Sequence, residues 1–87
     1  MEAGRVVYSK AGRDKRDVFI VISSNGEYVF LANGKTRLLE RPKKKKLKHI
    51  QPTNIVIKDI QDKLINNSLN NADLKKALLP YSSYREA

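Results

Sequence analysis

Apolar and polar residues alternate along the first third of the chain with the period of two that is typical of β-strands. The alternation covers residues 5–9 and 17–22, and a further apolar and aromatic run covers residues 28–32. The dipeptide Asn33-Gly34 follows this third run, and Asn-Gly between two β-type segments favours a type I′ hairpin turn. We therefore expect a fourth strand at residues 35–39.

Residues 40–46, with the sequence ERPKKKK, interrupt this pattern. Proline lacks an amide donor and four consecutive lysines repel one another, so we expect a mobile connector. A short fifth strand then fits residues 47–50, before Pro52-Thr53. Five short strands joined by tight turns predict a mainly β fold, a small five-stranded barrel of the SH3-like type. Its expected core comprises the following residues or their neighbours on the same faces: Val6, Val18, Ile20, Val29, Leu31 and Leu47.

After Asn54 the apolar period lengthens to that of a helix. One helical face would carry Ile57, Ile60 and Leu64, with acidic residues near its start, and the polar residues 66–68 would end this helix. Asn70 or Asn71 would cap a second short helix that ends near Pro80 and precedes a tail at residues 82–87. Its apolar face would comprise Leu74, Ala77, Leu78 and Tyr81.

The length of 87 residues fits one structural domain. We expect residues 1–53 to form the barrel and residues 54–87 to form a helical extension packed on or beside it. The chain contains no cysteine, which excludes disulfides and cysteine-ligated zinc. It also lacks an apolar run of the length that a membrane helix needs. These features favour a cytoplasmic protein without a membrane partner.

Positive charge is concentrated in the strand-rich part of the chain. The formal net charge is +9, and residues 1–52 carry 13 Lys and Arg against 5 Asp and Glu, a net charge of +8. Between the first two strands, residues 10–16 place four of these cations around Gly12. Glycine adopts positive φ readily and lets a phosphate approach the backbone, so this loop is a candidate RNA-binding element. The alternative is a solvated hairpin tip.

The segment from Gly4 to Ile22 resembles a KOW motif, the strand-loop-strand unit of ribosomal proteins and some transcription factors, with Gly12 at the characteristic glycine. Over about residues 4–53 the chain is similar to the fourteen-E family of eukaryotic- and archaeal-type large-subunit ribosomal proteins. The similar segments are GRVV, AGRDK, FIVI, YVFLANGKTR and LKHIQPT. The resemblance implies a ribosomal or ribosome-associated protein that binds large-subunit ribosomal RNA and neighbours other proteins of the translation or transcription machinery.

The expected RNA-binding residues lie in the first loop, the Asn-Gly hairpin, the lysine-rich connector and the expected fifth strand that follows it. They are Lys10, Gly12, Arg13, Lys15, Arg16, Lys35, Arg37, Arg41, Lys43, Lys44, Lys45, Lys46, Lys48 and His49. The lysine run has a second interpretation as a solubilising linker. Unpaired bases could also stack on an aromatic ring, with Phe19 or Tyr28 the best placed of Tyr8, Phe19, Tyr28 and Phe30, although aromatic residues at strand spacing more often belong to the core.

Catalytic motifs are absent from the sequence. It has no cysteine nucleophile, no glycine-rich loop of Walker type and no HExxH motif, and its single histidine has no partner at ligand spacing. The acidic residues Asp14, Asp17, Glu27 and Glu40 stand singly among basic ones, as local salt-bridge partners do. We expect a non-enzymatic protein without metal, cofactor or small-molecule substrate. The alternative to RNA binding is a KOW-type interaction module that docks a protein on the helical face of Ile57, Ile60, Leu64, Leu74 and Leu78.

Overall fold

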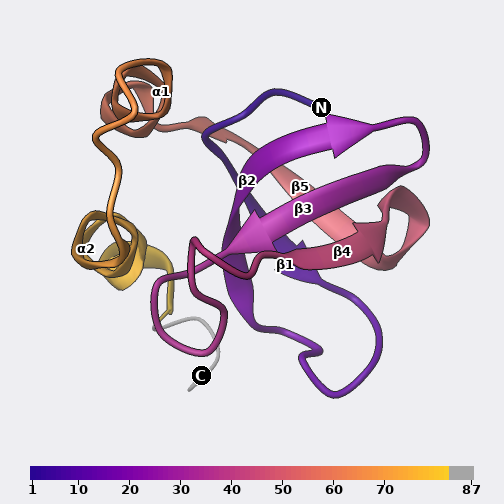
Figure 1. Ribbon diagram of the computed structural model, residues 1–87. Helices are drawn as coiled ribbons and strands as arrows, with labels where there is room; N and C mark the ends of the chain where they lie inside the picture. The colour runs from indigo at the N-terminus through magenta and orange to yellow at the C-terminus, as the bar shows by residue number, and fades with distance from the viewer. Residues whose placement is uncertain (83–87) are drawn as a thin grey trace.

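The structure, a computed structural model, describes residues 1–82 (Figure 1). It is mainly β, with a five-stranded antiparallel sheet followed by two helices, and the expected fold class is confirmed at this level. In chain order the elements are β1 (Arg5–Ser9), β2 (Val18–Asn25), β3 (Tyr28–Ala32), β4 (Lys43–Lys46), the 3₁₀-helix η1 (Leu47–His49), β5 (Ile50–Val56), α1 (Lys58–Ile65) and α2 (Asn71–Ser82). The strand order β4-β3-β2-β1-β5 makes β4 and β5 the edges.

Each face of the sheet builds its own apolar cluster, because successive strand residues point to opposite faces. The inner cluster comprises Val7, Phe19, Val21, Val29, Leu31 and Ile50, with Leu47 packed against it. The helix-covered cluster comprises Val6, Val18, Ile20, Ala32, Ile60, Leu74 and Leu78. Five of the six expected core residues are buried and Leu47 is partly buried, but they are divided between two clusters.

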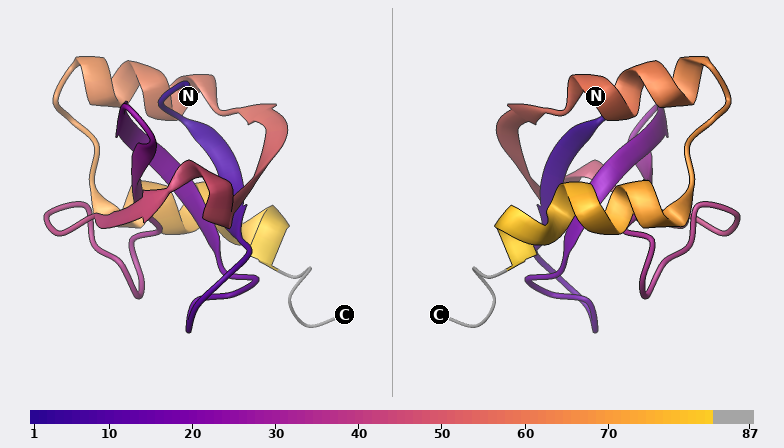
Figure 2. Two further views of the ribbon diagram at one scale, coloured as in Figure 1. Left: turned by 90° about the vertical axis from the view of Figure 1, so that its right-hand side faces the viewer. Right: turned by 90° about the vertical axis from the view of Figure 1, so that its left-hand side faces the viewer.

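Both helices lie on one side of the sheet, and α2 runs across it (Figure 2). Ile60 of α1 and Leu74 and Leu78 of α2 are buried against the strands. The alternative prediction, that this helical face is free to dock a protein partner, is therefore wrong, because the face packs against the sheet and completes the core. The boundary expected after residue 53 falls inside β5.

The fourth strand was predicted in the wrong place. Residues 35–39 form a loop, and β4 is the lysine run itself, paired with β3. Leu39, assigned to that strand, instead packs against the helix-covered cluster, and its N–H donates to Asn71 Oδ1 at 2.7 Å. The prediction of a mobile lysine connector is also wrong, because all four lysines belong to a strand that is hydrogen-bonded to β3. Each lysine lies opposite an apolar or aromatic residue of β3.

Asn33-Gly34 turns the chain, but not as a type I′ turn. Gly34 has the expected positive φ of 76°, whereas Asn33 is not among the residues with positive φ. The side chain of Asn33 instead accepts hydrogen bonds from the N–H groups of Lys35 and Arg37, both at 2.9 Å. Such an Asx-type turn leads into a wider loop, which explains why no strand follows directly.

The segment expected as the fifth strand divides at Ile50. Residues 47–49 form η1, and β5 continues through Pro52 to Val56. Pro52 therefore does not stop the strand. Since β5 is an edge strand that pairs with β1 alone, it tolerates a residue without an amide donor.

The two helices agree closely with the periodicity. Asn66–Ser68 follows α1 as expected, and Asn70 and Asp73 form reciprocal hydrogen bonds at the start of α2: the N–H of Asp73 donates to Asn70 Oδ1 at 2.9 Å, and the N–H of Asn70 donates to Asp73 Oδ2 at 3.3 Å. Pro80 lies inside α2, which extends to Ser82. The remainder of the expected tail, residues 83–87, lies outside the described residues.

Candidate nucleic-acid interface

Two basic loops leave the sheet at the same end. Because neighbouring strands are antiparallel, the β1–β2 connection and the β3–β4 connection emerge together, and both project downward in Figure 1. The first spans residues 10–17 and the near part of the second spans residues 33–37. We call these two segments together the loop end of the molecule.

The β1–β2 loop has a defined shape held by backbone hydrogen bonds. The N–H of Arg16 donates to the Ser9 carbonyl at 2.8 Å, and the N–H of Asp17 donates to the Asp14 carbonyl at 2.8 Å. Gly12 has φ +84°, as its place in the loop predicts, and Arg16 has φ +76°. The loop therefore presents its cations from fixed backbone positions.

A buried ion pair attaches this loop to β4. Lys45 Nζ donates to Asp14 Oδ1 at 2.6 Å and to the Ala11 carbonyl at 2.8 Å. Ser9 Oγ donates to the same Asp14 oxygen at 2.7 Å, and Lys43 Nζ lies 3.7 Å from Asp14 Oδ2. The side chain of Lys45 is only 8% exposed. Lys43 and Lys45, which were expected to contact RNA, thus bind Asp14 and support the loop from β4.

These contacts keep Asp14 ionised. Burial by itself would raise the pKa of Asp14, but the hydrogen bonds from Lys45 and Ser9 and the positive charges of Lys45 and Lys43 outweigh it, and the pKa lies below the ordinary value. The carboxylate consequently neutralises much of the charge beneath the loop, and the cations on the loop itself are left to face solvent.

The loop end carries six exposed cations. Their side chains form no hydrogen bond or ion pair with any residue between 1 and 82. They are Lys10, Arg13, Lys15, Arg16, Lys35 and Arg37. These six cations outnumber the two carboxylates of the loop end, Asp14 and Asp17, so the surface keeps a positive charge that attracts a polyanion at long range.

The other predicted residues are distributed around this end. Lys48 is exposed, and the carbonyl of its neighbour His49 accepts a hydrogen bond from the N–H of Lys10 at 2.8 Å, which places η1 beside the loop. Arg41 is exposed near the β3–β4 connection. Lys44 and Lys46 point to the opposite side of β4 from Lys43 and Lys45, away from the loop.

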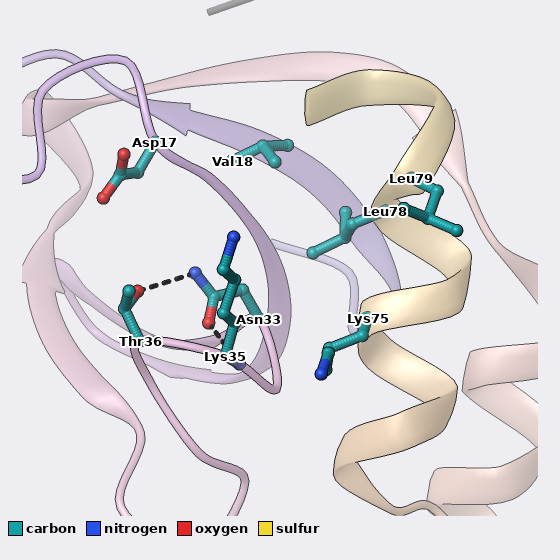
Figure 3. A pocket seen from close by; sticks show the side chains of 8 residues that line it. All are labelled: Asp17, Val18, Asn33, Lys35, Thr36, Lys75, Leu78 and Leu79. Atoms are coloured by element: carbon teal, nitrogen blue, oxygen red, sulfur yellow. Dashed lines mark hydrogen bonds between the residues drawn. The ribbon is translucent and has the colours of Figure 1, made fainter. Parts of the chain in front are cut away.

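A cleft of about 310 Å³ lies between the loop end and α2 (Figure 3). Its apolar wall is formed by Val18, Leu78 and Leu79, while Lys35 rises from the loop and Lys75 extends from α2. Lys75 was not among the predicted residues. In the sequence, Lys75 is indistinguishable from any other solvent-exposed lysine of an amphipathic helix. Its position beside the loop end depends on the packing of α2 on the sheet.

The sequence matches no protein-family model and no curated protein. Within residues 1–82 there is no group of three metal-ligating side chains of the His, Cys, Asp or Glu type. None of the described helices has the length and apolar character needed to cross a membrane.

Proposed function

We propose that the protein binds structured RNA through the loop end, with large-subunit ribosomal RNA as its target. One observation carries the proposal: six exposed cations, without partners among residues 1–82, project from two loops at the same end of a rigid sheet. Phosphates supply most of the affinity in such complexes, and fixed cation spacing supplies the match to a particular RNA shape.

We also propose that the sheet is a KOW-type, SH3-like barrel. Two contacts of η1 support strong curvature: the N–H of Leu47 donates to the Glu27 carbonyl at 2.8 Å, while the His49 carbonyl accepts from Lys10 at 2.8 Å. Three residues therefore connect the β2–β3 turn at one end of the sheet to the β1–β2 loop at the other. A short connection of this kind brings β4 and β5, the two edges, toward each other.

The two arginines of the β1–β2 loop are suited to discriminate between RNA targets. Arg13 and Arg16 each present a planar guanidinium that can bind a phosphate or a guanine edge with two hydrogen bonds. The ion pair of Asp14 with Lys45 fixes the loop that carries both arginines. A specific RNA contact requires both properties, a directional donor and a fixed support.

The test is a competition titration with a folded fragment of large-subunit ribosomal RNA, with unrelated structured RNA as competitor. If about five phosphates are neutralised, log K should fall against log salt with a slope of roughly −3.5 to −4.5. Replacing Arg13→Gln and Arg16→Gln should reduce this slope by roughly 2 units and lower the preference for the ribosomal fragment.

The matched control replaces Lys58→Gln and Lys76→Gln, two exposed cations of the helical layer. This control removes the same net charge as the double arginine variant. Because both lysines lie outside the loop end, their loss should lower RNA affinity only slightly and leave the preference for the ribosomal fragment unchanged. A flat salt response, or equal losses in the two double variants, would contradict the proposal.

A further inference from the structure

The β3–β4 pair carries two partly exposed aromatic rings that belong to neither apolar cluster of the described residues. Tyr28 and Phe30 are two residues apart on β3 and therefore point to the same face, yet both are absent from the inner and the helix-covered clusters. Both are partly exposed. The helices pack against the neighbouring part of the sheet, and α2 contacts β2.

The residues beside these rings are small and polar, or cationic. On β2, Ser23 pairs with Phe30 and Asn25 pairs with Tyr28; on β4, Lys44 pairs with Phe30 and Lys46 pairs with Tyr28. Direct cross-strand partners share a face. The β2 neighbours leave one side of the rings open, and the lysines supply positive charge on the other side.

A contact within this surface occupies one face of the Tyr28 ring. The ammonium group of Lys44 lies 4.3 Å from the centroid of the Tyr28 ring, in a cation–π contact. An exposed contact of this type is weak and exchanges readily for another flat or cationic group. Stacking with a nucleobase would use the same face while Lys44 moves to an adjacent phosphate.

We propose that the outer surface formed by Tyr28, Phe30, Lys44 and Lys46 binds unpaired nucleotides that extend from the structured RNA, with bases stacked on the rings and phosphates next to the lysines. Base stacking accepts any sequence and is combined with cations along the backbone in proteins that bind single strands. The inference rests on the proposed RNA binding and adds a second surface, on a different face of β4 from the lysines that support the loop.

An abasic tail tests the inference without altering the protein. The probes are a blunt RNA hairpin, the same hairpin with a single-stranded overhang, and the hairpin with an overhang of equal length that lacks bases. Because the two overhangs carry the same phosphates, the difference in Kd between them isolates stacking. We expect the natural overhang to bind roughly 5- to 100-fold more tightly than the abasic one.

Two variants locate the effect. Replacing Tyr28→Thr and Phe30→Thr removes both rings and introduces threonine, which also favours strands, so the two overhangs should then bind equally. Tyr28→Phe keeps the ring and should keep the difference. Lys44→Gln with Lys46→Gln should weaken both overhangs alike. Thermal melts of each variant report whether the sheet is intact.

The outcomes separate this inference from the proposed function. Equal binding of natural and abasic overhangs by the unaltered protein overturns the stacking surface, even if the blunt hairpin binds well. A difference that survives in the Tyr28→Thr, Phe30→Thr variant also overturns it. Concentration-dependent dimers that this variant abolishes would assign the face to a second copy of the chain instead. Failure to bind the blunt hairpin at moderate salt counts against the proposed function.

Discussion

Gly34 requires glycine for two reasons, of which the sequence indicates only one. The Asn-Gly dipeptide predicted positive φ, and the structure has it, but the tight constraint comes from α2. A Cβ at Gly34 would collide with the carbonyl oxygen of Asn71 and lie 3.1 Å from Leu74 Cβ. No local pattern reveals that a helix nearly forty residues later approaches this turn.

We expect Gly34→Ala to destabilise the fold far more than Gly26→Ala. Both glycines have positive φ, but a Cβ at Gly26 meets no atom within 4 Å. Gly26→Ala should therefore cost about 1 kcal/mol, the strain of a left-handed backbone alone, whereas Gly34→Ala adds a steric collision. Urea unfolding of the two variants measures the difference, and similar midpoints would argue against close packing of α2 on the loop.

Asp14 should make stability depend on pH in the acidic range. Its folded pKa is lowered, so the unfolded chain binds the proton more readily, and the contribution of Asp14 is present above about pH 4 and lost as pH falls through the folded pKa. The free energy of unfolding should thus fall more on acidification in the natural protein than in Asp14→Asn. Parallel pH profiles would mean that the clamp between the loop and β4 is not formed.

The lysine run illustrates why an element can be missed when all its residues are identical. Strand alternation is visible in a sequence only if the residues on the two faces differ chemically. Residues 43–46 are all lysine, so they show no alternation. In the sheet the run alternates nevertheless: Lys43 and Lys45 face Asp14, and Lys44 and Lys46 face outward beside the aromatic rings. Four residues predicted as one mobile, cationic group therefore have two separate roles.

Adjacent lysines of β4 should differ sharply in their effect on stability. Lys45→Ala removes one partner of a buried pair and should cost about 3 kcal/mol, because the Asp14 carboxylate is left without its main partner. Lys44→Ala removes a surface cation–π contact and should cost about 1 kcal/mol or less. Chemical denaturation compares them directly, and equal losses would place both side chains on the same face.

The apolar period of the second helix was easier to interpret, because its two faces differ in composition. Leu74 is fully buried, whereas Leu79 is 68% exposed. Leu74→Ala should lower the free energy of unfolding by about 2–5 kcal/mol and Leu79→Ala by about 0.5 kcal/mol or less. A thermal melt of each variant distinguishes them, and a small effect of Leu74→Ala would show that the helices do not complete the core.

The molecule as a whole was predictable in class and only partly in arrangement. Alternation identified β1 and β2, an apolar and aromatic run identified β3, and helical periodicity identified α1 and α2. The separation into two clusters was not predictable, since it depends on which strand neighbours which and on helices folding back over β2. The basic loop around Gly12 was identified from its composition, whereas its support by Lys45 arises from pairing between distant segments.

Charge is likewise arranged by the fold rather than by position in the chain. Residues 33–37 are separated from residues 10–17 by two strands, yet antiparallel pairing brings their cations to one end. The ion pairs among the described residues involve Arg5, Lys43, Lys45, Lys58 and Lys63, and the exposed cations of the loop end are not among them. This division is the basis of the proposed RNA surface.

The most direct test of that surface is a titration of isotope-labelled protein with the folded ribosomal RNA fragment at physiological salt, followed by amide chemical shifts. We predict that the largest changes occur at residues 10–17 and 33–37, with amides of the exposed side of α1 little changed. Changes centred on α1, or no residue-specific changes at saturating RNA, would contradict an RNA-binding loop end.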